Sequence, residues 1–149
     1  MYFLDYASPV GNLLLVSNTD AILRLERAEP SGRSDDCPLL HKAARELDEY
    51  FAGRRRTFDL PLRTAGTAFQ QAAWDALRQI PYGETRTYAQ QVAAVGCPKA
   101  ARAVGQANHR NPIAILIPCH RVIGSDGKLT GYGGGTDMKA FLLALEQHF

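Results

Sequence analysis

The spacing of apolar residues changes along this chain, and that change limits the fold more than any other feature. In the first 27 residues, short apolar runs alternate with turn-forming residues such as those at 8–11, a pattern typical of antiparallel strands. The predicted strands cover Tyr2–Tyr6, Leu13–Val16 and Ile22–Leu25. After a polar loop, apolar residues recur at helical spacing from Leu39 until Gly53. We therefore expect one helix packed against a small sheet.

The middle of the chain has helical spacing almost throughout. Thr67 and Thr87 are suited to cap two helices, and Gly96 ends the second of them. Pro98 is placed to open a further helix that runs to about Asn108. Two short helices joined by a glycine-containing turn are typical of a helix-turn-helix, although many such helical pairs bind nothing.

The last forty residues combine a predicted strand, a turn and a helix. The apolar run Ile113–Ile117 indicates a buried strand, and Ser125-Asp126-Gly127 indicates a hairpin. A closing helix carries its apolar stripe on Met138, Phe141, Leu142 and Leu145. Glu146 falls on the flank of that stripe, where a carboxylate needs a partner.

The order of these elements predicts an α+β protein in two parts. A chain of 149 residues has about the length of one domain, or of one domain with a small appendage. We expect a strand-rich N-terminal domain over residues 1–62, with a small antiparallel sheet and a helix. A mainly helical C-terminal domain containing the helix-turn-helix is expected over residues 67–149.

Cysteine content and the length of apolar runs indicate where the protein works. The three cysteines are odd in number, which excludes a fully paired disulfide framework and favours a reducing cytoplasm. No secretory signal is visible, and the longest apolar run is far shorter than the roughly 18 residues of a membrane span. We expect no membrane association and no metal site, because Cys37 and His41 lack two further zinc ligands.

Positive charge gathers in the second part of the chain. Residues 1–66 carry 9 Lys/Arg and 10 Asp/Glu, whereas residues 67–149 carry 8 and 5. The segment from Cys97 to Lys128 contains five basic residues and a single acidic residue, Asp126. Such an excess indicates an anionic partner such as nucleic acid, although an ordinary solvated surface would show the same charge.

Cys119 is the strongest candidate for a nucleophile. It follows the predicted strand and precedes His120 and Arg121, and a thiol near cations ionises more readily. His120 could accept the thiol proton, and Glu146 could orient the imidazole, as in a nucleophilic triad. The adjacency of Cys and His is compatible with coincidence and with a Cys-His hydrolase, so the residues leave the reaction open.

The second helix of the predicted helix-turn-helix has unusually small side chains. Ala101, Ala103 and Gly105 would let its backbone approach a narrow groove closely, and Lys99 and Arg102 are its cations. We expect such a helix to bind DNA without sequence preference, with Arg102 as a wedge in the base stack. The alternative is that the alanines pack against the neighbouring helix.

Several strings together closely resemble the O6-alkylguanine-DNA alkyltransferase family, also called methylated-DNA–protein-cysteine methyltransferases. They are FQQAAW at 69–74, IPYGETRTY at 80–88, ARAVGQA at 101–107, NP at 111–112, IPCHRV at 117–122, GYGGG at 131–135 and LLALE at 142–146. Weaker support comes from two upstream segments, SPVG at 8–11 and the pattern L-x-x-Y-F-x-G from Leu47 to Gly53. The resemblance covers nearly the whole chain.

The resemblance assigns roles to the catalytic residues. It implies that Cys119 accepts the alkyl group, that His120 takes its proton through a water molecule, and that Glu146 holds His120 in place. Asn111 would brace the turn that carries the nucleophile. Tyr88 would rotate a backbone phosphate and donate a proton to the guanine as it leaves.

The resemblance also implies how DNA and the base are held. Arg102 would fill the gap left by the flipped nucleotide, Tyr132 would wall the base pocket, and the carbonyls of Cys119 and Val122 would read the guanine amino group. Gly133 stands where the family often has serine, so a hydroxyl is lost from the pocket. The zinc ligands that some relatives carry in the N-terminal part are absent, and no cofactor is implied.

The expected function is therefore DNA repair by irreversible self-alkylation. The partner would be double-stranded DNA carrying O6-alkylguanine, with O4-methylthymine as a further substrate. A monomer is expected, and cooperative binding along DNA is left open. Two rivals stand beside this hypothesis, namely a module that senses lesions without transferring the group, and a Cys-His hydrolase.

Overall fold

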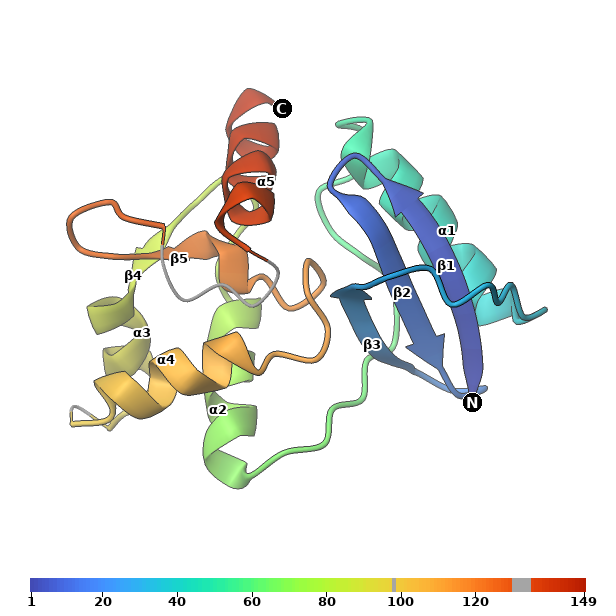
Figure 1. Cartoon of the computed structure of the whole chain (residues 1–149). Coiled ribbons are helices and arrows are strands. Elements are labelled where there is room, and N and C mark those ends of the chain that lie inside the picture. The colour runs from blue at the N-terminus through green and yellow to red at the C-terminus, as the bar shows by residue number, and fades with distance from the viewer. Residues whose placement is uncertain (98, 130–134) are drawn as a thin grey trace.

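The computed structural model describes residues 1–97, 99–129 and 135–149 and has an α+β fold. A sheet and one helix form the N-terminal part, and helices dominate the C-terminal part (Figure 1). In chain order the elements are β1 (Tyr2–Ser8), β2 (Gly11–Ser17), β3 (Ile22–Arg27), α1 (Pro38–Phe51), α2 (Ala68–Arg78), β4 (Arg86–Thr87), α3 (Tyr88–Val95), α4 (Ala101–His109), a 3₁₀ turn (Cys119–Arg121), β5 (Val122–Ile123) and α5 (Thr136–His148). The predicted fold class is confirmed.

The N-terminal sheet follows from the alternation of its apolar residues. Strands β1, β2 and β3 pair antiparallel in sequence order, with Leu15 of the central strand opposite Leu4 and Leu25. Leu13 and Leu15, two positions apart, are both fully buried, because side chains two apart point to the same face of a strand. Helix α1 covers one face of this sheet (Figure 1).

Two threonines start the helices that the sequence predicted them to start. The hydroxyl of Thr67 accepts from the backbone N–H of Gln70, and the hydroxyl of Thr87 accepts from that of Gln90. Each glutamine side chain bonds back to the threonine N–H, which completes a capping box. Gly96 ends α3 at a φ of 81°, a left-handed conformation that suits glycine. The predicted helix-turn-helix pair is therefore α3 and α4.

Buried polar contacts hold that pair in place. Gln91 of α3 and Asn108 of α4 exchange two side-chain hydrogen bonds of 2.7 and 2.8 Å. The indole of Trp74, in α2, donates to the carbonyl of Ala107 at 2.8 Å. Because unpaired polar groups are costly inside a protein, these bonds select one packing of α2, α3 and α4.

The structure corrects three local predictions. Helix α4 begins at Ala101 and not at Pro98, which lies outside the described residues. The run Ile113–Ile117 forms a turn and not a strand, with Ile115 at a φ of 70°. A turn is present at 124–128, but within the described residues no strand follows it, and β5 instead pairs parallel with β4.

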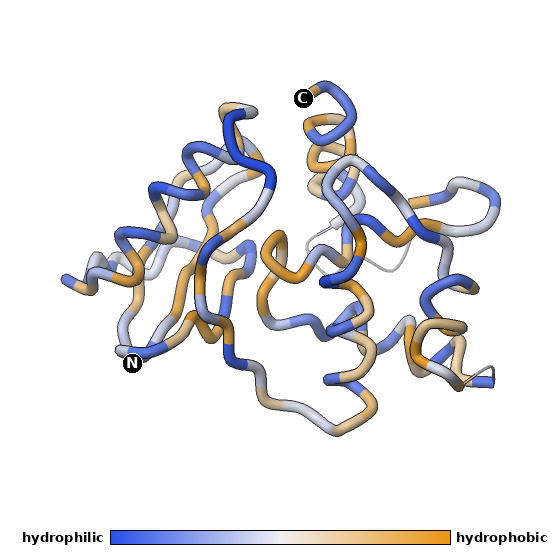
Figure 2. The backbone as a smooth tube through the Cα atoms, turned by 180° about the vertical axis from the view of Figure 1, so that it is seen from behind, coloured by the Kyte–Doolittle hydropathy of each residue, from blue (hydrophilic) through white to orange (hydrophobic). Residues whose placement is uncertain are grey.

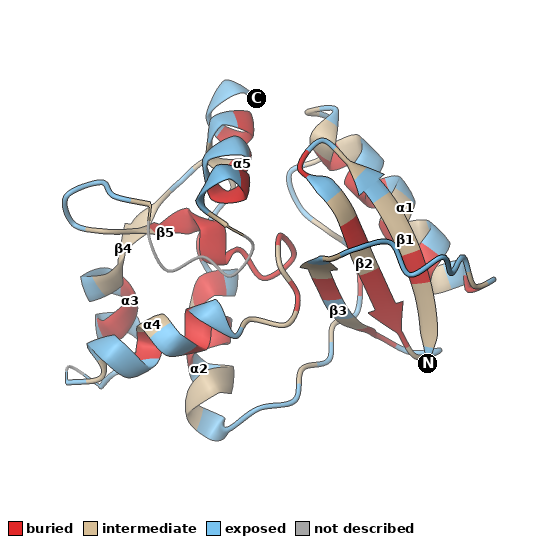
Figure 3. Cartoon of the chain, in the orientation of Figure 1, coloured by how far each residue is buried: buried red, intermediate tan, exposed pale blue. Residues whose placement is uncertain are grey.

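The apolar run forms a turn because it links the two parts of the chain. The N–H of Leu25 donates to the carbonyl of Pro112, and the N–H of Ala114 donates to that of Leu25. Ile113, Ile115 and Ile117 are buried, so tertiary contacts replace the ladder of a strand. Figures 2 and 3 show the apolar, buried segments of both parts facing each other across this contact.

The division into domains at residues 62–67 stays a prediction, since buried residues of both parts join one apolar core. Within the described ranges, no helix has the length and apolarity needed to cross a membrane. The same residues contain no group of three or more His, Cys, Asp or Glu that could hold a metal ion.

Candidate active site

Cys119 opens a single 3₁₀ turn directly after Pro118 and is 6% exposed. The side-chain amide of Asn111 spans this turn, because its Nδ2 donates to the carbonyl of Ile117 at 2.7 Å and to Cys119 Sγ at 3.2 Å. Its Oδ1 accepts from the N–H of Ile113 at 3.0 Å. Asn111 thus connects both ends of the apolar turn to the sulfur. The resemblance implies a bracing role for this residue.

His120 is fully buried and paired with Glu146. Its Nε2 lies 2.7 Å from Glu146 Oε2, so this nitrogen carries the proton and Nδ1 keeps a lone pair. Among the described residues, Nδ1 has no hydrogen-bond partner. Burial lowers the pKa of His120 below its ordinary value, although Glu146 opposes the shift. The imidazole is therefore neutral near pH 7 and can accept a proton at Nδ1.

Glu146 has the partners that a buried carboxylate requires. Arg121 donates from Nε to Oε1 at 2.8 Å and from Nη2 to Oε2 at 3.2 Å. Tyr50 donates its hydroxyl to Oε2 at 2.6 Å, and the N–H of Gly83 reaches Oε1 at 3.4 Å. Burial alone would raise the pKa of Glu146, but the bonds from His120 and Arg121 lower it to about 2. The group is a permanent anion at neutral pH.

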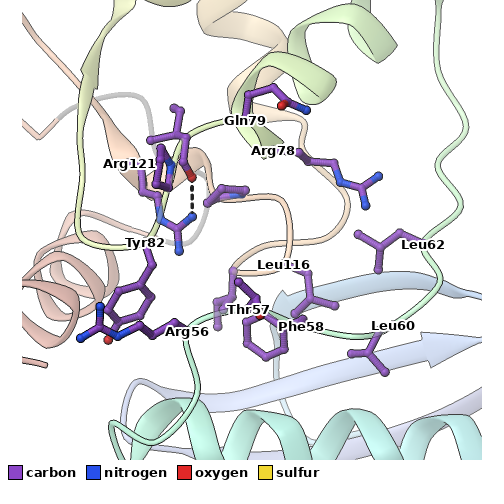
Figure 4. A pocket seen from close by; sticks show the side chains of 14 residues that line it. Arg56, Thr57, Phe58, Leu60, Leu62, Arg78, Gln79, Tyr82, Leu116 and Arg121 are labelled. Atoms are coloured by element: carbon purple, nitrogen blue, oxygen red, sulfur yellow. Dashed lines mark hydrogen bonds between the residues drawn. The ribbon is translucent and has the colours of Figure 1, made fainter.

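The cavity behind Arg121 is separate from the thiol. It has a volume of about 240 Å³ and lies between the two parts of the chain, with Leu60 and Leu62 on one side and Gln79 and Arg121 on the other (Figure 4). The guanidinium of Arg121 donates to the carbonyl of Ile80 there at 2.7 Å. Since Cys119 and His120 do not line this cavity, it is not the site of the nucleophile.

The charge that acts on Cys119 differs from the one predicted. Burial raises the pKa of the Cys119 thiol to about 11, and the Asn111 hydrogen bond and the positive charge of Lys139 offset part of that rise. Arg121 was expected to assist ionisation, but its charge is committed to Glu146. The thiol is thus protonated at rest, and a base has to remove its proton.

Lys139 lies at the candidate site, although the sequence did not single it out. It is 1% exposed, its ammonium donates to the carbonyl of Val122, and it lies 5.8 Å from the centre of the Tyr88 ring. The Val122 carbonyl, expected to read guanine, accepts this lysine in the structure. A signal was present, because Lys139 and Glu146 are seven positions apart and therefore share the buried face of α5.

Removing the Lys139 charge should slow the alkyl transfer that the resemblance implies, because it raises the pKa of Cys119 further. For Lys139→Met we expect about a tenfold lower rate at neutral pH, equivalent to one pKa unit, with the alkaline rise of the rate displaced to higher pH. Single-turnover rates on methylated duplex across a pH series measure this. Lys128→Met, which removes an exposed lysine paired with Asp126, is the control, and equal rates for both variants would contradict the role.

Tyr88 stands at the first position of α3, close to the nucleophile and to the proposed recognition helix. Burial and the nearby Cys119 sulfur raise its pKa, so its hydroxyl is protonated and can donate at neutral pH. The same tyrosine lines a groove with Ala101, Arg102, Gly105, Gln106, His109 and Arg110 of α4 and its end. Gln106, His109 and Arg110 were not among the predicted DNA-binding residues.

The exposed face of α4 has the small side chains that the sequence indicated. Ala101, Arg102 and Ala103 are exposed, as is Lys99 ahead of the helix. A Cβ added at Gly105 would meet nothing within 4 Å. The alternative, that the alanines pack against a neighbouring helix, holds for Ala107, which is 2% exposed and accepts from Trp74 of α2, and not for the exposed Ala101 and Ala103. Tyr132 and Gly133, the predicted pocket residues, lie outside the described residues.

A buried cysteine followed by a histidine that a carboxylate holds, together with a helix-turn-helix, is the arrangement expected of a DNA-binding protein that acts through a thiol. Comparison with known families identifies the class further. The DNA-binding domain of 6-O-methylguanine DNA methyltransferase matches residues 68–148, and the ribonuclease-like domain of the same family matches residues 1–64. The chain belongs to the 6-O-methylguanine DNA methyltransferase family.

Individual relatives agree over the full chain. The methylated-DNA–protein-cysteine methyltransferase of Methanosarcina barkeri is 50% identical, with 99% of this chain and 98% of the relative covered. The constitutive enzyme of Bacillus subtilis is 48% identical, with 98% and 95% covered. The crystal structure of Mycobacterium tuberculosis OGT in complex with DNA superimposes with a TM-score of 0.91 at 46% identity, with 99% and 94% covered.

Proposed function

We propose that this protein repairs DNA by transferring the alkyl group of O6-alkylguanine to Cys119, once per molecule. The arrangement around the thiol carries this proposal. Asn111 bonds to the sulfur at 3.2 Å, and the next residue is a neutral histidine that Glu146 orients at 2.7 Å. A thiol, a base and an orienting carboxylate are the components of nucleophilic catalysis. The family and its DNA-bound relative supply the substrate class.

The proposed reaction exchanges a proton for an alkyl group. Cys119 loses its proton to Nδ1 of His120 through a water molecule, and the sulfur forms a bond to the alkyl carbon while the carbon–O6 bond of guanine breaks. The leaving guanine takes a proton from the Tyr88 hydroxyl, which the imidazolium restores. The Cys119 pKa of about 11 explains why a base is needed. The product is a thioether, which water does not hydrolyse, so no second turnover follows.

The target base has to leave the duplex before it can react. In the proposed complex α4 lies in the minor groove and Arg102 fills the space left in the base stack, which offsets the cost of extruding the nucleotide. The Cys119 carbonyl and the lone pair of the Val122 carbonyl that Lys139 leaves unused, with Tyr132 and Gly133, would hold the extruded base. O4-methylthymine is a second candidate substrate, the protein would act as a monomer, and the cytoplasm suits its three free cysteines.

Mass spectrometry tests the function directly. After incubation with a methylated duplex oligonucleotide, we expect one added methyl group on the peptide that carries Cys119, in a ratio of at most one per protein molecule. Unmodified protein that still binds the lesion would support the sensing module instead. Repeated turnover of an ester or amide would support the hydrolase.

Replacing Arg102 should affect duplex repair much more than reaction with a free base. Arg102→Ala removes the group proposed to fill the stack, so we expect repair of methylated duplex to slow about tenfold or more, while free O6-benzylguanine reacts at the wild-type rate. Arg110→Ala, from the same groove, controls for the loss of one positive charge. Equal slowing on both substrates would exclude the wedge role.

A further inference from the structure

One donor to the catalytic carboxylate comes from the N-terminal part of the chain. The hydroxyl of Tyr50, in the last turn of α1, donates to Glu146 Oε2 at 2.6 Å. The same oxygen lies 2.7 Å from Nε2 of His120. A hydroxyl so close to an ionised carboxylate forms a charge-assisted bond, which is stronger than a bond between neutral groups.

The Tyr50 hydroxyl is held in a fixed direction. The residue is 0% exposed, and three aromatic rings surround its own, with centroids 5.3 Å away at Phe51, 5.4 Å at Phe58 and 6.3 Å at Tyr82. Such edge and tilted contacts restrict rotation of the ring. Packing from both parts of the chain therefore fixes the position of the hydroxyl, with Phe51 and Phe58 in the first part and Tyr82 in the second.

Tyr50 and His120 compete for one oxygen. Glu146 Oε2 accepts from Tyr50, from His120 and, at 3.2 Å, from Arg121 Nη2. Each donor withdraws negative charge from that oxygen, so the hydroxyl weakens the attraction between the carboxylate and the imidazole. The same hydrogen bond restrains the position of Oε2. The Tyr50 hydroxyl therefore affects both the orientation of the His120 imidazole and its pKa.

We propose that Tyr50 is a positioning residue for alkyl transfer, whose hydroxyl keeps Glu146 Oε2 where it orients His120. The N-terminal part of the chain thereby completes the active site of the C-terminal part. This inference rests on the proposed function, because it assigns Tyr50 to the proton-accepting unit of that reaction. Sequence separation is 96 residues, so the contact exists only in the folded full chain.

A role in positioning has a signature that a purely structural role lacks. The charged groups acting on His120 are Glu146, Arg121 and Lys139. Without the hydroxyl, Oε2 carries more negative charge toward the imidazole, so the pKa of His120 should rise. Since only the neutral imidazole accepts the thiol proton, the acidic limb of the pH–rate profile should move to higher pH.

The experiment compares Tyr50→Phe with Tyr6→Phe in the full-length protein. Tyr6 also belongs to the N-terminal part and donates to a carboxylate, that of Asp48, at 2.6 Å. Neither Tyr6 nor Asp48 contacts Glu146 through any described hydrogen bond. Phenylalanine keeps the ring packing in both variants. The measurements are single-turnover rates on methylated duplex across a pH series, together with an NMR titration of the His120 ring.

We expect Tyr50→Phe to slow transfer about fivefold at neutral pH and to move both the acidic limb and the His120 titration upward by roughly half a pH unit. Tyr6→Phe should match the wild type in both readouts. A Tyr50→Phe variant with an unmoved limb and titration, whatever its rate, would overturn the inference. Wild-type protein that acquires no methyl group would overturn the proposed function itself, and this outcome is visible before any variant is made.

Discussion

A Cys119→Ala variant is expected to bind methylated duplex DNA with wild-type affinity and to remove no methyl group from it. The thiol is the proposed acceptor, and alanine offers no atom that could form a bond to the alkyl carbon. Affinity should persist because the proposed DNA contacts are made by α4 and by Tyr88, and the substitution removes neither. A gel-shift titration and the retention of the lesion after incubation measure the two effects separately.

The other two cysteines provide matched controls for this loss. Cys97 is exposed and Cys37 is buried at 3% exposure, so together they represent an accessible and an inaccessible thiol outside the site. Cys97→Ala and Cys37→Ala should transfer the methyl group at the wild-type rate. Methylation of either residue, or removal of the lesion by Cys119→Ala, would contradict the assignment of the nucleophile.

A Glu146→Gln variant is expected to lose both activity and stability. Its buried amide would leave the Arg121 guanidinium, 8% exposed, without a counter-charge, and breaking a buried ion pair typically costs about 3–5 kcal/mol of the free energy of unfolding. Transfer should slow about 100-fold or more, because His120 loses the group that fixes its tautomer. Chemical denaturation and single-turnover rates measure the two losses.

The same helix supplies the control for this variant. Asp137, also in α5, pairs with Arg27 through two hydrogen bonds of 3.1 and 2.8 Å, but its side chain is 72% exposed. Asp137→Asn should therefore cost less than about 1 kcal/mol and leave transfer unchanged. If Glu146→Gln lowers the free energy of unfolding no more than Asp137→Asn does, burial does not strengthen the ion pair between Glu146 and Arg121.

Acid should remove the stabilising effect of Glu146. Its pKa in the folded protein is lowered to about 2 from an ordinary value of 4.5, so the unfolded chain binds more protons over this interval. The stabilisation is fully present above pH 4.5 and declines as the pH falls toward 2. The difference in unfolding free energy between wild type and Glu146→Gln should shrink over that range, and a constant difference would contradict the pKa.

Local features of the sequence predicted local structure well. Thr67 and Thr87 cap helices because the hydroxyl and the glutamine three residues later are neighbours along the chain. The same holds for Gly96, whose positive φ ends α3. The run Ile113–Ile117 was misassigned because burial on all sides is compatible with a strand and with a turn, and its partner, Leu25, lies far away in the sequence.

The candidate site was predictable only in part for the same reason. Cys119 and His120 are adjacent, so their association was visible, and the border position of Glu146 on α5 indicated that it needed a partner. Tyr50 lies on the apolar stripe of α1 and was indistinguishable from a core residue. The spacing of Lys139 from Glu146 indicated that Lys139 is on the buried face of α5, but not which group it contacts. Their partners, Glu146 and Val122, come from other elements.

By itself, the sequence determined the three N-terminal strands, most of the helices, the helix caps and the candidate nucleophile, because these depend on residues within one or two turns of each other. Only the tertiary structure decided the electrostatics of that nucleophile. Burial makes the Cys119 thiol harder to ionise, the charge of Arg121 is taken up by Glu146, and Lys139 faces the sulfur instead. Such effects depend on distance in space and on exclusion of water, which no local pattern of residues encodes.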